Sequence, residues 1–317
     1  MKNLFDRQKR FNDLFFNEKE LDKIQKEEIT RSLSLALHAE VSDMISAINF
    51  KDHREERLEI DIEKIVYESV DAFRYILAIM NLWEITPQKF LECFDDKDLF
   101  LHARHASNKK KWKAQPVLIV DIDDVLAKFR DGFNTWLEET YNIDIDHQSS
   151  EYYTTSEVKE AGLNPETVFD RFISERHLAN LVPCEKMIKV INSLHHSGYW
   201  IHLLTARPQA RHVCFYDTYR WLDKVNLHYD RLSFSPEKYR WLTKTDYFDS
   251  EKVICAIDDS PKHAAEYAKH GIKVLVPKEI YNTEVHEMEN VILYQESSDV
   301  VAIVKSLCTY NYFLFLS

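Results

Sequence analysis

The sequence predicts two domains, an all-α helical bundle followed by an α/β domain built on a parallel sheet. Three observations lead to this prediction. The chain has 317 residues, and domains usually contain about 100–200. Its four glycines all lie beyond residue 131, so the first part lacks the residues that normally form hairpin turns. In the second part, β-branched runs end in aspartate or threonine, which is typical of parallel strands with a ligand site at their carboxyl ends.

The composition excludes several classes of protein. Hydrophobic residues at 45% and charged residues at 30% describe a globular chain and not a disordered one. The formal net charge of −12 argues against nucleic acid or an anionic membrane as a partner. The five cysteines show no C-x-x-C spacing, which favours reduced thiols and a cytoplasmic location. The N-terminus does not resemble a signal peptide, and no apolar run approaches the roughly 20 residues of a membrane span.

Four amphipathic segments predict the bundle, at about residues 4–16, 27–50, 61–83 and 87–105. Pro87 suits the first turn of the last helix. A polar, lysine-heavy stretch then precedes a strongly apolar run and is interpreted as a linker. The predicted organisation is a helical domain at 1–106, a linker at 107–115, an α/β domain at 116–305 and an apolar tail at 306–317 of unassigned role.

Two predicted helices carry the same pair of carboxylates, Glu40-x-x-Asp43 and Glu68-x-x-Asp71. Residues three apart share one face of a helix, and both pairs have apolar neighbours. Four carboxylates on adjacent helices repel one another unless a cation lies between them. Oxygen-rich sites of this kind suit magnesium. Either pair alone is more typical of a solvated acidic face, but the duplication and the apolar neighbours together favour a metal site.

These residues resemble the signature of the all-α NTP pyrophosphatases, the superfamily of MazG and the dimeric dUTPases. The segments LFDRQKRFND, INFKDH and ESVDAFRYIL are similar to motifs of the dimeric dUTPase branch. The resemblance implies magnesium-dependent hydrolysis of a (d)NTP to a (d)NMP and pyrophosphate, with Glu40 as a candidate base, and a homodimer or higher homo-oligomer formed through this domain. It also implies a set of substrate-binding residues: Gln8, Asn12, Lys51, Lys97 and Arg104.

In the second domain, the chemical groups lie where predicted strands end. VLIVD (117–121) ends in Asp121, with Asp123 two residues on, and the run at 200–205 ends in Thr205. The run at 253–257 is followed by Asp258 and Asp259, and a fourth strand is expected at 272–276. Because the carboxyl ends of parallel strands meet at one edge, these groups are expected to form one site.

The order D-x-D-x-V, then hhhT, then hhhDD resembles the haloacid dehalogenase (HAD) superfamily of phosphotransferases, which implies a Rossmann-like fold with a helical cap, here at about 129–195. By resemblance, Asp121 is the nucleophile, Asp123 the acid and base, and Thr205 a phosphoryl ligand. Magnesium is then held by Asp121, Asp123 and Asp258 or Asp259. The charge-balancing lysine is Lys238, with Lys244 as the alternative, and Arg207 binds substrate.

The segment LVPCEKMIKVINSLHHSGYWIHLLTARP is similar to the 5′(3′)-deoxyribonucleotidase branch of that superfamily. The sequence therefore predicts a bifunctional nucleotide hydrolase with magnesium in both domains. The alternative is a phosphatase of another phosphomonoester with the helical domain as a dimerisation or nucleotide-sensing module. Five aromatic side chains of the cap are candidates either for stacking on a base or for core packing: Phe129, Phe133, Trp136, Tyr152 and Tyr153.

Overall fold

The computed structural model describes residues 1–17, 19–48, 59–109, 112–147, 149, 151–208, 211–248 and 252–314, apart from the side chains of 104–109 and 309–314. Its contacts divide the chain into two compact units, Met1–Asp95 and Asp96–Ser317. The helices are α1 (Lys2–Asn12), α2 (Lys23–Ser46), α3 (Ile62–Leu82), α4 (Pro87–Lys109), α5 (Phe129–Tyr141), α6 (Thr155–Glu160), α7 (Pro165–Ser174), α8 (Glu185–His196), α9 (His212–Lys224), α10 (Lys238–Leu242), α11 (Pro261–Lys269) and α12 (Ser297–Leu314). The strands are β1 (Val117–Val120), β2 (Trp200–Thr205), β3 (Arg231–Phe234), β4 (Val253–Ile257), β5 (Val274–Pro277) and β6 (Val291–Tyr294), and two 3-10 helices are η1 (His177–Asn180) and η3 (Ile280–Val285).

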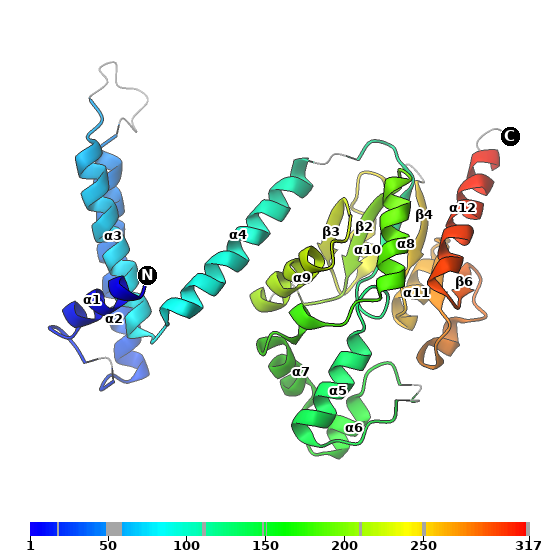
Figure 1. Ribbon diagram of the computed structural model, residues 1–317, viewed down its shortest axis with the longest axis horizontal. Coiled ribbons are helices and arrows are strands. Elements are labelled where there is room, and N and C mark those ends of the chain that lie inside the picture. Colours follow the sequence, from blue (N-terminus) through cyan, green and yellow to red (C-terminus); the bar gives the residue numbers. More distant parts are fainter. Residues whose placement is uncertain are drawn as a thin grey trace. The chain divides into compact units, whose positions relative to one another are not determined.

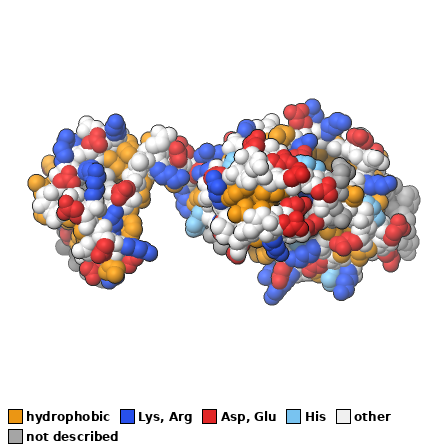
Figure 2. Space-filling model, turned by 90° about the horizontal axis from the view of Figure 1, so that it is seen from below, with side chains coloured by type: hydrophobic (Ala, Val, Ile, Leu, Met, Phe, Trp, Pro, Cys, Tyr) orange, Lys and Arg blue, Asp and Glu red, His pale blue; other side chains and the backbone are white. Residues whose placement is uncertain are grey.

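The first unit is helical, as predicted. Asp22 caps α2 in a reciprocal capping box with Gln25, and Asp61 caps α3. The helix α2 packs along α3, and α1 is tied to α3 by a hydrogen bond from the Asn81 amide to the carbonyl of Phe5 at 3.1 Å. No residue of α2 is buried, and Leu35 is 74% exposed. Apolar side chains are visible on the surface of this unit in Figure 2. Homo-oligomerisation through this unit stays a prediction, and this apolar surface is what such a contact would cover.

The boundary between the units differs from the predicted one. Residue 106 lies inside α4, and the second half of that helix belongs to the second unit. Asp96 in this half of the helix is a buried carboxylate that pairs with Arg176 at 2.9 Å and also with Arg220. The sequence gives no sign of this docking, since an aspartate in a surface helix usually faces solvent.

The second unit is a Rossmann-like α/β fold, as predicted. Its sheet has the order β3-β2-β1-β4-β5-β6, and every neighbouring pair is parallel. Leu118 and Val120 of β1 face a core formed with α8, α9 and α12, whereas Val117 and Ile119 face a second core formed with α10 and α11. Both faces of β1 are therefore buried, which explains its uninterrupted apolar run. The strands β3 and β6 were not among the predicted strands.

The cap follows β1 directly. The helices α5, α6 and α7 lie together beyond one end of the sheet in Figure 1. The predicted cap range of 129–195 extends too far, because α8 packs on β2 and α12 and thus on the sheet. Gly132 packs closely in the cap, since a Cβ there would lie 2.8 Å from Cδ2 of Leu181 and the Leu181 side chain would have to shift.

The C-terminal segment from 306 continues α12 as far as Leu314. Among the described residues, no helix combines the length and apolar character needed to cross a membrane.

Candidate active site

Four strands deliver polar groups to one edge of the sheet. Asp121 follows β1, Thr205 ends β2, Lys238 begins the helix after β3, and Asp258 and Asp259 follow β4. The backbone amide of Asp121 donates to the carbonyl of Ile257 at 2.9 Å, which continues the β1–β4 ladder past the last strand residue. The ladder thus fixes the position of Asp121 relative to the Asp258 segment.

Lys238 connects two of these strands through its ammonium. It is fully buried, and Nζ lies 2.8 Å from Oδ2 of Asp121 and 2.7 Å from Oδ2 of Asp258. Burial alone lowers the pKa of Lys238, but the two carboxylates outweigh it and raise that pKa. By contrast, Lys244 is exposed and lies over the ring of Trp241, 5.9 Å from its centroid. Of the two candidate lysines, only Lys238 contacts the carboxylates.

The negative charge of the aspartates around Lys238 exceeds the positive charge of its ammonium. Asp121, Asp258 and Asp259 each place one oxygen within 4.8 Å of the others. Three carboxylates and one ammonium leave two negative charges when all are ionised. Burial therefore raises the pKa of Asp121 to about 7 despite the opposing effect of Lys238, and burial also raises the pKa values of Asp258 and Asp259.

This donor set fits magnesium. Oδ1 of Asp259 is buried and has no hydrogen-bond partner in the described part of the chain. Buried carboxylate oxygens without a donor are costly unless a cation binds them. The ligands are all oxygen atoms, which is the preference of Mg²⁺. A divalent ion would also balance the two excess negative charges.

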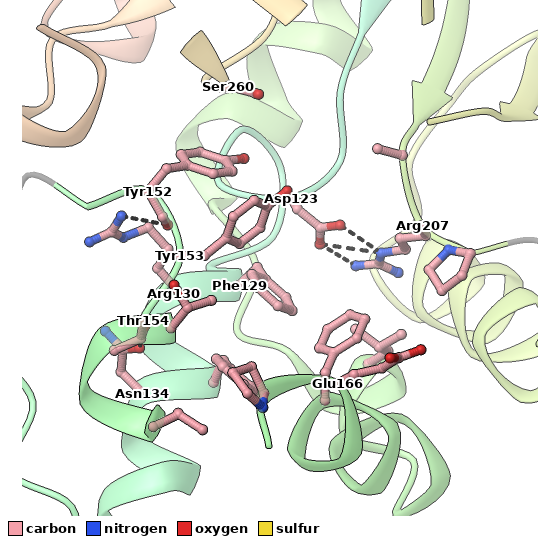
Figure 3. Close-up of a pocket in the computed structure, with 18 of the residues that line it drawn as sticks. Asp123, Phe129, Arg130, Asn134, Tyr152, Tyr153, Thr154, Glu166, Arg207 and Ser260 are labelled. Atoms are coloured by element: carbon pink, nitrogen blue, oxygen red, sulfur yellow. Dashed lines mark hydrogen bonds and ion pairs between the residues drawn. The ribbon is translucent and has the colours of Figure 1, made fainter. Parts of the chain in front are cut away.

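Asp123 is held by an arginine. Nε of Arg207 donates to both oxygens of Asp123, at 3.2 and 2.9 Å, and Nη2 donates to one of them at 2.6 Å (Figure 3). Nη1 donates to the hydroxyl of Thr218 at 3.0 Å, which fixes the plane of the guanidinium. The backbone amide of Arg207 donates to Oγ1 of Thr205 at 3.2 Å. These contacts bring the predicted acid, phosphoryl ligand and substrate-binding arginine together.

A cavity of about 370 Å³ lies above this edge, between the sheet and the cap. Asp121, Asp123, Arg207 and Ser260 line its sheet side. Its cap side carries aromatic side chains among aliphatic and polar ones, and the aromatic residues named in advance are Phe129, Phe133, Tyr152 and Tyr153. Figure 3 shows Tyr152 and Phe129 facing the space beside Asp123. The fifth candidate, Trp136, is buried away from the cavity lining, where it packs on Phe172 and donates to Glu175 at 3.1 Å.

Several residues of the site have no signature in the sequence. Arg130 donates from Nη1 to the carbonyls of Glu151 and Tyr152, both at 2.8 Å, and its guanidinium lies 4.1 Å from the centroid of the Tyr281 ring. It thereby fixes the loop that carries Tyr152. Asp124 has a positive φ of 53° and accepts from the amide of Arg130 at 3.0 Å, which shapes the turn after Asp123. The D-x-D-D run could have indicated such a turn, but no spacing predicts the Arg130 contacts.

In the helical unit, the predicted carboxylates are only partly gathered. Glu40, Glu68 and Asp71 each place one oxygen within 4.8 Å of the others, whereas Asp43 is exposed and lies outside that group. The pKa of Glu40 is raised by desolvation and by the neighbouring acids Glu68, Asp71 and Asp43. The described structure therefore groups three of the four carboxylates that the repeated motif predicts to lie together.

The predicted base-binding residues of this unit bond to its own helices. Nε2 of Gln8 donates to Asn12 at 3.0 Å, Oδ1 being the acceptor, and Arg74 donates to Oε1 of Gln8 at 3.1 Å. Lys97 is exposed, belongs to the second unit and lies over the Phe100 ring. Lys51 and the side chain of Arg104 lie outside the described residues. Substrate binding by these residues stays a prediction.

Comparison with known proteins identifies the α/β unit. A family model described as 5′ nucleotidase, deoxy (pyrimidine), cytosolic type C protein matches residues 115–307. The match begins after the helical unit and does not include it. No significant match was found among curated proteins.

Solved structures with a similar fold were also found. They include YfnB of Bacillus subtilis, described as a HAD-hydrolase and bound to magnesium (14% identity, 61% of this chain and 100% of that chain, TM-score 0.44). A HAD-superfamily hydrolase of subfamily IA from Geobacter sulfurreducens has 12% identity over 62% of this chain and 99% of that chain, with a TM-score of 0.42. A D,D-heptose 1,7-bisphosphate phosphatase from Burkholderia thailandensis has 10% identity over 59% and 97%, with a TM-score of 0.36.

The parallel sheet, the aspartates after β1 and β4, and the buried lysine after β3 define a hydrolase of the HAD phosphatase type. Within that class, the chain belongs to the 5′ nucleotidase, deoxy (pyrimidine), cytosolic type C family, whose model spans most of its length.

Proposed function

We propose that the α/β unit removes the phosphate from a deoxyribonucleoside monophosphate through a phosphoryl group carried on Asp121. The observation that supports this most strongly is the position of Asp121. One of its oxygens is bound by Lys238, and the other is buried, unpartnered and beside the cavity. A carboxylate oxygen in that position is a candidate nucleophile for a phosphorus atom in the cavity.

The chemistry balances with the residues at hand. Oδ1 of Asp121 forms a bond to phosphorus as the bond from phosphorus to the ester oxygen breaks, and Asp123 gives a proton to the departing alkoxide. Water then attacks the phosphorus, Asp123 takes its proton, and Asp121 is regenerated as phosphate leaves. Bound magnesium would supply charge neutralisation for the phosphoryl group, held by Asp121, Asp258 and Asp259.

The cavity favours a nucleotide among phosphomonoesters. Its volume lies within the range of about 300–1,000 Å³ that is usual for small-molecule sites. Asp121, Asp123 and Arg207 lie on the sheet side and several aromatic rings lie on the cap side, so a phosphate group and a flat base each have suitable neighbours. A sugar phosphate would leave the aromatic side without a partner.

A substrate screen tests this proposal. The full chain is supplied with Mg²⁺ and with each ribo- and deoxyribonucleoside monophosphate, and with sugar phosphates of similar charge, and released phosphate is measured. We expect kcat/KM to be at least about 10-fold higher for a deoxynucleoside monophosphate than for any sugar phosphate, since burying one aromatic contact contributes about 1.5 kcal/mol. A sugar phosphate as the best substrate would contradict the proposal.

We also propose that the helical unit hydrolyses a (d)NTP to a (d)NMP and pyrophosphate with magnesium. The group of Glu40, Glu68 and Asp71 on two helices supports this, because three clustered acids with a raised pKa at Glu40 suit a divalent ion. The product would then be a substrate for the α/β unit. The competing hypothesis is that this unit only senses nucleotides or dimerises, and it predicts no pyrophosphate.

A further inference from the structure

Three histidines gather at the end of the sheet opposite the cavity. His195 and His196 are the last two residues of α8, and His228 lies in the loop between α9 and β3. One ring nitrogen from each lies within 4.8 Å of those of the other two. The ring centroids are 5.0 to 6.2 Å apart. The cluster thus joins two segments that are more than thirty positions apart in the sequence.

Hydrogen bonds select the tautomers of two of these rings. Nε2 of His195 lies 3.3 Å from a carboxylate oxygen of Asp230, and Nδ1 of His196 lies 2.6 Å from the carbonyl of Asn192. Carboxylate and carbonyl oxygens only accept, so each of these nitrogens carries the hydrogen. The other nitrogen of each neutral ring then keeps its lone pair, which is the form that binds a metal ion.

The surrounding residues hold the cluster in place. Asn192 accepts from the backbone amide of His228 at 2.7 Å through Oδ1 and donates to the carbonyl of Asn226 at 3.1 Å. Asp230 also accepts from the amide of Ile201 at 3.0 Å. His195 and His228 are half-buried and His196 is exposed, so an ion can enter from solvent. A histidine whose second nitrogen bonds to a carboxylate or carbonyl is the usual arrangement around a protein-bound metal.

We propose that His195, His196 and His228 bind a transition-metal ion, Zn²⁺ in the first instance, with water as the fourth ligand. Three imidazoles suit zinc and related ions, whereas Mg²⁺ prefers oxygen. Tetrahedral zinc with bonds of about 2.0–2.1 Å places its nitrogen ligands roughly 3.3 Å apart. The three ring nitrogens, which lie within 4.8 Å of one another, would therefore move together by up to about 1.5 Å when the ion binds. Such an ion would tie α8 to the loop before β3.

Calorimetric titration with Zn²⁺ tests whether the three histidines bind this ion. The full chain is made without a polyhistidine tag and is titrated in excess Mg²⁺. The variants are His196→Ala, His228→Ala and Asp230→Asn. The matched control is His270→Ala, because His270 also ends a helix and bonds through Nδ1 to a carbonyl four residues back, but belongs to no such cluster. Co²⁺ absorption provides a second readout, since tetrahedral nitrogen coordination gives visible bands far stronger than octahedral oxygen coordination.

We expect the wild type and His270→Ala to bind one Zn²⁺ that both histidine variants bind at least 10-fold more weakly. Asp230→Asn should weaken it by about 10- to 100-fold, as loss of a supporting carboxylate usually does. The intense Co²⁺ bands should disappear in His196→Ala. An identical Zn²⁺ stoichiometry and affinity in wild type and both histidine variants would overturn the proposal, as would the absence of Zn²⁺ binding. Circular dichroism of each variant verifies that it is folded.

Discussion

The guanidinium of Arg207 contacts both carboxylate oxygens of Asp123, at 2.6 to 3.2 Å. A carboxyl group that gives a proton to a leaving oxygen needs one oxygen free of that contact. Arg207 lines the same cavity, so a substrate phosphate is a competing anion for its guanidinium. In the proposed reaction the substrate therefore draws Arg207 away from Asp123 and frees the acid.

Arg207 should accordingly affect both substrate binding and turnover. We expect Arg207→Gln to lower kcat/KM for a deoxynucleoside monophosphate by about 100-fold, as loss of one phosphate-binding donor does. Arg207→Lys should recover only part of this, because an ammonium lacks the two-pronged geometry. Steady-state kinetics with separate kcat and KM values measure the effect. Wild-type values of both constants in Arg207→Gln would contradict this role.

The two lysine candidates give a matched pair of variants. Lys238→Met removes the ammonium that contacts both Asp121 and Asp258, and we expect phosphatase activity to fall by at least about 1,000-fold. Lys244→Met changes an exposed side chain and should leave activity within about twofold. Phosphate release and circular dichroism are measured for both. The opposite ranking would assign the role to Lys244.

The acids of the helical unit should control pyrophosphate release. In an Asp121→Asn background, which preserves any (d)NMP formed, we expect Glu68→Gln to lower pyrophosphate production from a (d)NTP by at least about 100-fold. Glu63→Gln is the control, since Glu63 is an exposed acid of the same helix. Pyrophosphate is quantified with each (d)NTP and Mg²⁺. If no (d)NTP yields pyrophosphate with Glu68 intact, the unit is a sensing or dimerisation module.

His202 should make the α/β unit sensitive to acid. This residue is fully buried, and its ring forms hydrogen bonds with the hydroxyls of Ser233 and Tyr247. Burial is the main cause that lowers the pKa of His202 to about 3, and the positive charge of Arg231 lowers that pKa further. The unfolded chain binds a proton below about pH 6.5 and the folded chain does not, so stability falls as the pH drops from 6.5 toward 3. Between pH 7 and pH 5 the loss is about 2 kcal/mol.

Urea unfolding at pH 7 and pH 5 measures this loss. His202→Gln should be less stable than the wild type at pH 7, because it loses bonds to Ser233 and Tyr247, yet should lose about 2 kcal/mol less on acidification. His270→Gln, a change at an exposed histidine, should lose as much as the wild type. Equal losses in all three proteins would show that His202 does not set the acid sensitivity.

The sequence predicts those features that depend on local pattern. The helices of the first unit follow from their periodicity, and the groups at the site follow from buried strands that end in aspartate or threonine. Parallel strands necessarily bring such residues to one edge, so Asp121 and Asp258 meet although 137 positions separate them (258 − 121).

The features that the sequence does not predict depend on tertiary contacts. Asp96 is buried and pairs with Arg176 and Arg220, which lie far along the chain. Arg130 fixes the Tyr152 loop through backbone carbonyls, which leave no trace in residue identity. The histidine cluster joins residues whose spacing matches no metal-binding motif. Each case requires knowing which surfaces pack together.

The proposed reaction passes through a phosphoryl group on Asp121, and mass spectrometry can detect that group directly. The full chain is mixed with Mg²⁺ and its best deoxynucleoside monophosphate, stopped with acid during turnover, and digested. We expect the peptide containing Asp121 to gain the mass of one phosphoryl group, and we expect fragmentation to place that group on Asp121 and not on Asp123. The same peptide of Asp121→Asn should carry no phosphoryl group. Steady phosphate release with no phosphoryl group on Asp121, or release that persists in Asp121→Asn, would contradict the proposed reaction.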